Sequence, residues 1–182
     1  MKKIFLTFIA IIMLTGCSFG KNMDNTPTKK VETYLNNYQT LDSTVLSKLD
    51  SIVEGEVSFN SDQKEKYKNI LKKHYQNLTY NIKEETINGD KATVEVEIEV
   101  NDYTKILKDA ETYKNTNSKE FLNENNQFDE KKYNDYKLEQ IEKGKEKVKY
   151  TLFFSLTKID DTWTLDTLTQ TEEEKILGIY EY

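Results

Sequence analysis

The chain has 182 residues, a length that suits one domain with a modest core rather than two domains. All 26 basic residues are lysines; 32 residues are acidic, and the net charge is −6. An acidic chain without arginine argues against nucleic-acid binding, because neutralisation of phosphates supplies most of that affinity. The single cysteine can form neither an internal disulfide nor a cysteine-based zinc site. No motif fixes an enzymatic activity, and we expect no cofactor and no metal.

Residues 1–16 have the layout of a secretory signal peptide. Two lysines precede an apolar run over residues 4–14, and the small residues Thr15 and Gly16 lead to Cys17. The apolar run is shorter than the roughly 20 residues that a membrane-spanning helix needs. We therefore expect cleavage before Cys17 rather than a permanent transmembrane anchor.

The segment Leu14-Thr15-Gly16-Cys17 resembles the lipobox of bacterial lipoproteins. The resemblance implies that the Cys17 thiol receives a diacylglyceryl group, with fatty chains such as palmitate, and that the Gly16–Cys17 bond is cleaved. Two acyl chains, at about 0.8 kcal/mol per buried CH₂, provide on the order of 20 kcal/mol of membrane attachment. The alternative is an ordinary secretory signal with a chance cysteine. We expect a lipid-anchored protein on the extracytoplasmic face of the cell membrane, with residues 17–28 as lipidated cysteine and flexible tether.

Three helices are predicted in the first half of the remaining chain. Thr26-Pro27 is an N-cap followed by proline at the first helical position. Asp42-Ser43 can cap a second helix, and Asn60 with Gln63 forms a capping box for a third. Apolar residues at helical spacing follow each cap.

Two β-hairpins follow. Residues 80–87 alternate weakly and lead to Asn88-Gly89, the strongest short hairpin signal, before the strict alternation of residues 92–100. The second hairpin covers residues 150–165 and turns at Asp160-Asp161. These patterns predict antiparallel strands with one buried face.

Residues 104–147, between the hairpins, form a charged insertion. We expect one helix around residues 106–113 and another capped by Asp129, joined by a mobile, asparagine-rich segment over residues 115–127. A short last helix is predicted to start at a capping box of Thr171 and Glu174. The fold class is therefore α+β, with N-terminal helices packed on a curved antiparallel sheet of two hairpins and a helical insertion between them.

Residues 29–182 resemble, as a single domain, the nuclear-transport-factor-2-like (cystatin-like) domains of small Gram-positive lipoproteins. The resemblance implies a cone-shaped pocket, but its superfamily includes isomerases, hydrolases and binding modules, so the fold alone does not choose a function. The residues that carry it are Tyr34-Leu35 through Leu41-Asp42, Tyr80-Asn81-Ile82, Asn88 to Val94, and Thr162-Trp163-Thr164-Leu165.

Tyrosines offer one candidate ligand pocket. The predicted inward faces carry Tyr34, Tyr38, Tyr80 and Tyr150, which could surround a flat or sugar-like ligand. The alternative is that they are core residues with solvated hydroxyls.

Three further features each have a functional and a structural interpretation. His74, the only histidine, could be a general base, but we favour a histidine at the edge of the core with one nitrogen in water. The glutamates at 95, 97 and 99 could bind a cation or a basic partner, although a solvated sheet face relieved by lysines on a neighbouring strand is the simpler interpretation. Residues 123–129 are rich in oxygen ligands but lack the EF-hand pattern, so we interpret them as a loop and a helix cap.

We expect a non-enzymatic module that binds an envelope protein, a peptide or a small molecule. The alternative is an isomerase- or hydrolase-like enzyme that uses a buried carboxylate and a tyrosine, for which Asp102 beside Tyr103 is the pair to name. A purely structural envelope protein is a third hypothesis.

Overall fold

The computed structural model describes residues 25–181, so the predicted signal peptide, the lipobox and Cys17 lie outside the described residues. Within this range, six α-helices and one 3₁₀ helix accompany a single four-stranded antiparallel sheet in the order β1-β2-β3-β4. The α+β class is confirmed. The elements are α1 (Pro27–Thr40), α2 (Ser43–Gly55), α3 (Ser61–Gln76), β1 (Thr79–Asn88), β2 (Lys91–Asn101), α4 (Tyr103–Thr116), η1 (Ser118–Phe121), α5 (Glu130–Lys143), β3 (Lys147–Ile159), β4 (Thr162–Leu165) and α6 (Gln170–Leu177).

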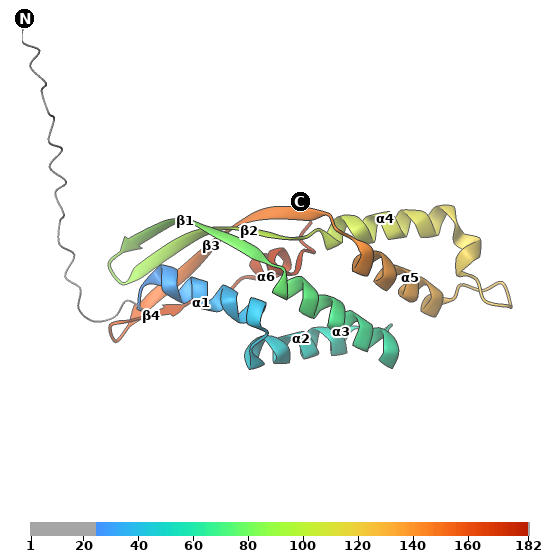
Figure 1. Cartoon of the computed structure of the whole chain (residues 1–182), viewed down its shortest axis with the longest axis horizontal. Helices are drawn as coiled ribbons and strands as arrows, with labels where there is room; N and C mark the ends of the chain where they lie inside the picture. Colours follow the sequence, from blue (N-terminus) through green and yellow to red (C-terminus); the bar gives the residue numbers. More distant parts are fainter. Residues whose placement is uncertain (1–24, 182) are drawn as a thin grey trace, which may run out of the picture.

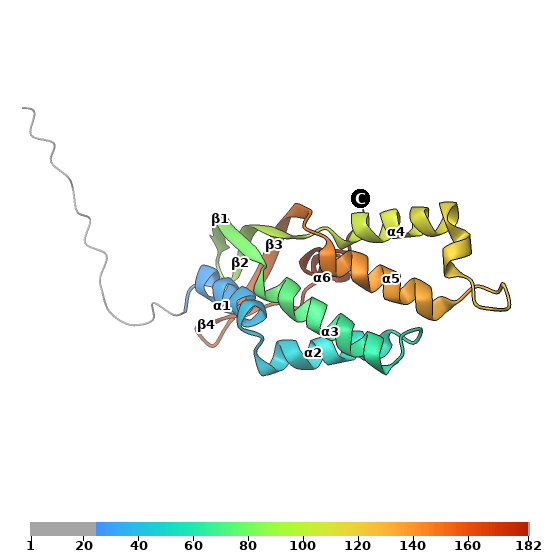
Figure 2. The same ribbon diagram turned by 45° about the vertical axis from the view of Figure 1, so that its right-hand side comes forward.

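The molecule is elongated, with the sheet toward one end and two helical hairpins toward the other (Figure 1). The helices α1 and α6 cover one face of the sheet, while the α2–α3 and α4–α5 pairs extend beyond it in both views (Figures 1 and 2). The predicted insertion is the α4–α5 hairpin. Its base lies against the end of the sheet, and this junction is where a cleft forms.

The three predicted N-caps are confirmed. The side chain of Thr26 accepts a hydrogen bond from the amide of Lys29 at 3.1 Å, and Asp42 accepts one from Val45 at 2.8 Å. The capping box at Asn60 is complete, because it and Gln63 exchange side-chain-to-backbone bonds. These local bonds satisfy amides that a helix start leaves unpaired.

The folded domain begins earlier than the tether prediction placed it. The side chain of Asn25 donates to the Asp161 carbonyl at 2.7 Å and accepts from the Trp163 amide at 3.0 Å. In addition, the Thr28 amide and hydroxyl both donate to Glu85 of β1, at 2.8 and 2.7 Å. Residues 25–28 are therefore fixed to the β3–β4 turn and to β1, and they are not part of a flexible tether.

The core lies between the sheet and its helices. Alternate side chains of β2 are buried, as the sequence pattern predicts, including Val94, Val96 and Ile98. Residues of β3 on the same face, such as Phe154, continue this layer, and Leu35 of α1 is fully buried with them. Burial at about 25 cal/mol per Å² of apolar surface supplies the main driving force for this arrangement.

Both predicted hairpins are present, and the first turn is displaced by one residue. Asn88 pairs with Lys91, so the two loop residues are Gly89 and Asp90, with Gly89 at φ 62°. In the second hairpin, Asp160 and Asp161 both have positive φ, 47° and 61°. Two positive φ values are typical of the turn whose twist matches that of the flanking strands.

One sequence prediction in the second half of the chain is wrong in detail. The capping box of α6 is formed by Thr169 and Glu172 instead of Thr171 and Glu174. Both pairs have the three-residue spacing that a capping box requires. Use of the upstream pair lets the helix begin at Gln170, which gives it eight residues. The asparagine-rich segment at 115–127 contains η1, whose Phe121 is buried against Tyr113 of α4 and Tyr133 of α5.

Candidate ligand-binding cleft

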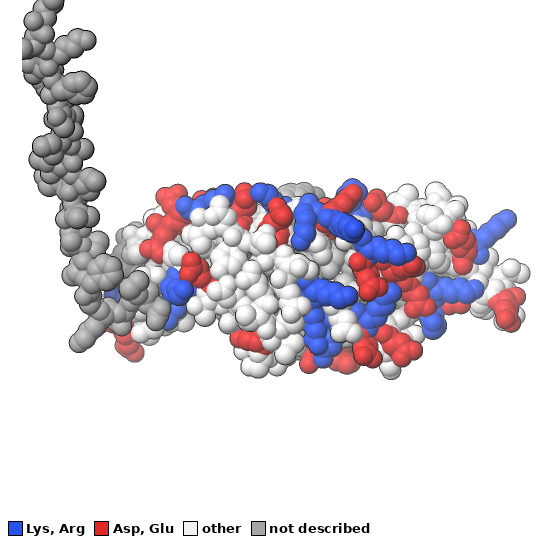
Figure 3. All heavy atoms as spheres, in the orientation of Figure 1, with Lys and Arg blue, Asp and Glu red and all other residues white. Residues whose placement is uncertain are grey.

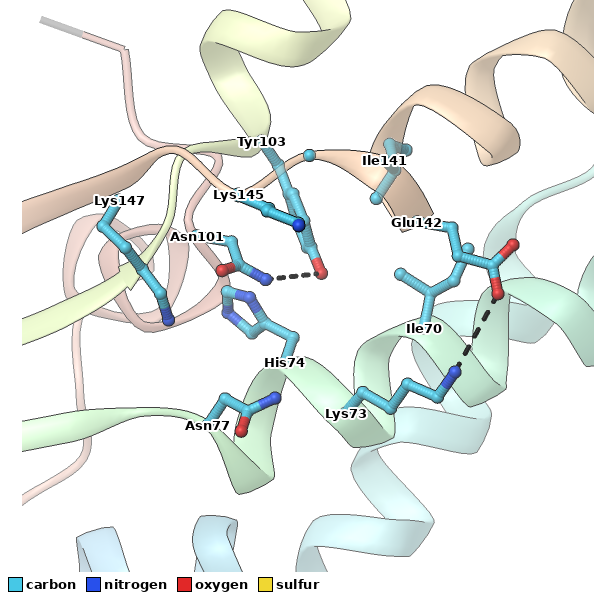
Figure 4. A pocket seen from close by; sticks show the side chains of 11 residues that line it. Ile70, Lys73, His74, Asn77, Asn101, Tyr103, Ile141, Glu142, Lys145 and Lys147 are labelled. Atoms are coloured by element: carbon cyan, nitrogen blue, oxygen red, sulfur yellow. Dashed lines mark hydrogen bonds and ion pairs between the residues drawn. The ribbon is translucent and has the colours of Figure 1, made fainter.

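Three segments that are distant in the sequence meet where the sheet joins the helical hairpins, and they enclose a cleft of about 380 Å³ (Figure 4). The last turns of α3 contribute His74, and the passage from β2 to α4 contributes Asn101 and Tyr103. The passage from α5 to β3 contributes Lys145 and Lys147. Its volume lies within the range of small-molecule sites.

His74 forms one side of the cleft and is only 2% exposed. Its Nε2 lies 2.9 Å from the Ile176 carbonyl oxygen, which can only accept a hydrogen bond. Nε2 therefore carries the proton, and Nδ1 is left with a lone pair. This Nδ1 is buried and has no hydrogen-bond partner among residues 25–181.

The protonation of His74 follows from its surroundings. Burial lowers the pKa of the imidazole from 6.5 to about 4, and the charge of Lys147 adds to this effect, while the hydrogen bond to Ile176 opposes it. The ring is neutral at pH 7. A buried acceptor without a partner costs about 1–3 kcal/mol, so His74 carries an unsatisfied acceptor at this site.

The cleft is positively charged although the chain as a whole is acidic. Lys73, Lys145 and Lys147 line it together with one carboxylate, that of Glu142. Glu142 is already engaged by Lys66 at 3.2 Å and by Lys73 at 3.9 Å. Charged side chains of both signs gather over the α3 and α5 region of the surface (Figure 3). Neither Lys145 nor Lys147 has an ion pair with another described residue.

Gly178, directly after α6, contacts two residues that line the cleft, Asn101 and Tyr103. Its carbonyl accepts from the amides of Tyr103 and Thr104 at 2.9 and 3.2 Å, which joins the end of α6 to the start of α4. It has φ 75°, and an added Cβ would lie 2.1 Å from the Asn101 carbonyl oxygen. Only glycine fits at this point. The ring of Tyr103 then lies 4.7 Å from that of His74, centroid to centroid, with a tilt of 33°.

The structure places two of the four predicted pocket tyrosines, Tyr34 and Tyr38, on α1 and the other two, Tyr80 and Tyr150, on strands of the sheet. The hydroxyls of Tyr34 and Tyr38 lie 3.0 Å apart on α1, and burial raises the pKa of Tyr38 to about 12. The hydroxyl of Tyr80 donates to Asn36 at 3.0 Å. Tyr150 packs edge-on against a C-terminal ring, that of Tyr180, at 5.9 Å.

Two of these tyrosines are separated by a core side chain. Tyr80 and Tyr150 are both paired with Ile98, one on each side, so Ile98 stands between them in one cross-strand row. Tyr38 lines a smaller cavity of about 210 Å³ together with Tyr75. The structure thus brings Tyr34 and Tyr38 together on α1, and it places Tyr80 and Tyr150 apart from each other on the sheet.

The glutamates of β2 lie on the solvated face of the sheet, as the simpler interpretation predicts. Glu97 contacts Lys149 of β3 at 3.2 Å and Lys83 of β1 at 3.5 Å. Lys149 also reaches Glu99 at 3.9 Å. Hydrogen bonding to Lys149 is the main reason that the pKa of Glu97 is lowered. Lysines on both neighbouring strands therefore relieve the repulsion at Glu97, and Lys149 also does so at Glu99.

The remaining candidate residues cap helices or close a loop, except Tyr103, which lines the cleft. Asp102 caps α4 by accepting from the Lys105 amide at 2.9 Å, whereas its neighbour Tyr103 lines the cleft. The side chain of Asn123 closes its own loop by accepting from two amides, and Asp129 caps α5. Within residues 25–181, no group of three or more His, Cys, Asp or Glu side chains is arranged to hold a metal ion.

The sequence analysis singled out His74 as a possible base and Tyr103 as a partner of Asp102, and it did not predict that His74 and Tyr103 line the same cleft. It assigned no role to Asn101, Lys145 or Lys147, which lie at the ends of elements where neither helical nor strand periodicity applies. It also expected one nitrogen of His74 in water, whereas the unpartnered Nδ1 is buried. Lys143, Lys145 and Lys147, which alternate with other residues around the start of β3, are the signal in the sequence for the charge of the cleft.

Comparison with known proteins finds a lipid attachment site at the N-terminus. Residues 1–18 match the model of the prokaryotic membrane lipoprotein lipid attachment site, a match that includes Cys17. No curated protein matches the chain. A crystal structure of YcdA from Bacillus subtilis, described as a candidate lipoprotein, is similar at 20% identity and a TM-score of 0.45. That match covers 76% of this chain and 47% of YcdA, so the chain spans about half of that protein's length.

The attachment site implies lipid-anchored association with a membrane. No helix within residues 25–181 is long and apolar enough to cross one. The family model extends only to residue 18, so the resemblance of residues 29–182 to nuclear-transport-factor-2-like domains stays a prediction.

Proposed function

We propose that this protein is a lipid-anchored, non-enzymatic binding module on the extracytoplasmic face of the cell membrane. In this proposal the diacylglyceryl group on Cys17 holds it at the membrane, and residues 18–24 link the lipid to the folded domain. The signal-peptide layout and the lipid attachment match at residues 1–18 support the anchoring. The binding role is supported chiefly by the cleft at His74, which contains a buried, unpartnered acceptor beside unpaired lysines.

The composition of the cleft favours binding over catalysis. Its lining residues include no serine, threonine or cysteine that His74 could activate as a nucleophile. The enzyme alternative needs a buried carboxylate beside a tyrosine, and the one carboxylate that lines the cleft, that of Glu142, is exposed and ion-paired with Lys66 and Lys73.

The anchoring is tested by Cys17→Ala, with Ser18→Ala as the matched control. We expect the Cys17 variant to lose lipid labelling and membrane retention, and the control to keep both. Protease treatment of intact cells, or of spheroplasts if there is an outer membrane, should degrade the anchored wild-type protein. A Cys17 variant that is still lipidated and retained, or a wild-type protein protected from protease, would contradict this part of the proposal.

The binding role is tested by a thermal-shift screen of the purified lipidated protein against small polar metabolites, followed by mass spectrometry of each hit. We expect at least one compound to raise the melting temperature saturably, because a ligand that binds only the folded state stabilises it. The compound should be recovered unchanged after prolonged incubation. A compound that is converted would favour the isomerase- or hydrolase-like enzyme, and the absence of any hit would contradict the small-molecule form of the proposal.

A further inference from the structure

We infer that the cleft at His74 binds a small organic anion that also carries a hydroxyl or amide N–H donor, such as a hydroxycarboxylate or a sugar phosphate. This inference rests on the proposed binding function and names the site and the class of ligand. Three features of the cleft support it: a buried hydrogen-bond acceptor, two unpaired lysines, and walls that enclose a small volume.

The acceptor is Nδ1 of His74. The Ile176 carbonyl holds the proton on Nε2, so Nδ1 can only accept a hydrogen bond, and residues 25–181 provide no donor to it. Figure 4 shows the imidazole beside the space bounded by Asn101, Tyr103 and Lys147. A ligand that binds here gains most if it carries an O–H or N–H group.

The charge comes from Lys145 and Lys147, which have no carboxylate partner among the described residues, whereas Lys73 shares Glu142 with Lys66. A carboxylate or phosphate group would complement the two unpaired ammonium groups. The same charges disfavour a ligand whose donor is itself an ammonium group. The donor that meets Nδ1 is therefore a neutral hydroxyl or amide.

The walls and the volume limit the size of the ligand. Ile70, Ile141 and the ring of Tyr103 offer apolar surface for a short carbon skeleton, and the amides of Asn77 and Asn101 offer further polar contacts. A cleft of about 380 Å³ is suited to a molecule of metabolite size. It is too small for a folded partner.

His74 allows a direct test, because it is the only histidine in the chain. In the lipidated protein in detergent micelles, labelled with ¹⁵N-histidine, one imidazole gives the whole signal. We expect the ligand-free protein to show protonated Nε2 and unprotonated Nδ1. Gluconate should move the Nδ1 resonance saturably to lower frequency, as accepting a hydrogen bond requires, and glucose 6-phosphate tests the phosphate source of the same chemistry.

Two compounds matched to gluconate separate the donor from the charge. Hexanoate has the carboxylate without hydroxyls, and sorbitol has the hydroxyls without a charge. We expect each to bind at least about tenfold more weakly than gluconate or glucose 6-phosphate, a difference of about 1.4 kcal/mol. The inference is overturned if neither hydroxylated anion moves Nδ1 saturably, if hexanoate or sorbitol acts equally well, or if Nδ1 carries the proton.

The lysines are tested by Lys145→Gln with Lys147→Gln, and Lys119→Gln is the matched control. Lys119 is exposed on η1, away from the cleft. We expect the double variant to weaken binding about tenfold or more and the control to leave it unchanged. Equal affinities in all three proteins would overturn the charge step. If a compound from the thermal-shift screen binds without moving the His74 nitrogens, the binding function stands and the assignment to this cleft fails.

Discussion

Acidification should destabilise the protein through His74. Burial, together with the charge of Lys147, lowers the pKa of the folded-state imidazole to about 4, against an ordinary value of 6.5. Between these two values the unfolded chain binds a proton that the folded protein does not bind. Above about pH 6.5 both states are neutral at this position and the stability is fully present. It is then lost progressively as the pH falls toward 4.

The size of the effect follows from the two pKa values. Between about pH 7.5 and about pH 5, the difference in proton binding reduces the free energy of unfolding by about 2 kcal/mol. This is a large part of the stability that a single domain usually has. It should be easy to measure.

The assay is urea unfolding at both pH values, followed by the fluorescence of Trp163, the only tryptophan, which is buried. The comparison protein is His74→Gln, whose side-chain amide can still donate to the Ile176 carbonyl but does not titrate. Carboxylates titrate in both proteins and cancel in the comparison. We expect the wild-type protein to lose about 2 kcal/mol more than the variant over this interval. An equal loss in both would refute the assignment of a buried, neutral His74.

Three further predictions concern the fold. Gly178→Ala should be destabilising by about 1–3 kcal/mol more than Gly89→Ala, because both glycines have positive φ but only Gly178 faces a backbone oxygen; equal urea midpoints would contradict this. Thr169→Ala should cost about 1 kcal/mol in thermal unfolding and Thr171→Ala much less, since the first residue caps α6; the reverse order would restore the downstream capping box. Asn25→Ala should speed hydrogen exchange at the start of α1 by releasing it from the β3–β4 turn, and unchanged exchange would show that this link is unimportant.

The local elements could be predicted from the sequence because their determinants are local. The caps at Thr26, Asp42 and Asn60 act within one helical turn, and the alternation of β2 follows from a single half-buried face. The same locality explains the error at α6. Two capping boxes with identical spacing compete there, and no short-range rule separates them.

For the tyrosines, the sequence pattern predicts the direction of the side chains but not whether they surround a cavity. Their inward orientation is correct, since Tyr38 and Tyr150 are buried on the predicted face. Whether inward side chains surround a cavity or fill a core depends on what packs between them. Ile98 lies between Tyr80 and Tyr150, so a core residue occupies that position, and only the packed structure reveals it.

The sequence by itself determined the lipid attachment site, the α+β class and the elements of the domain, because an attachment motif, a helix cap and a periodic pattern each depend on a few neighbouring residues. Only the tertiary structure decided the position of the cleft. It is built where the end of α3, the passage from β2 to α4 and the passage from α5 to β3 meet, segments that are far apart in the sequence. Its central feature also depends on a contact over a long sequence distance, that of His74 with Ile176. That contact fixes the proton on one nitrogen and leaves the other without a partner.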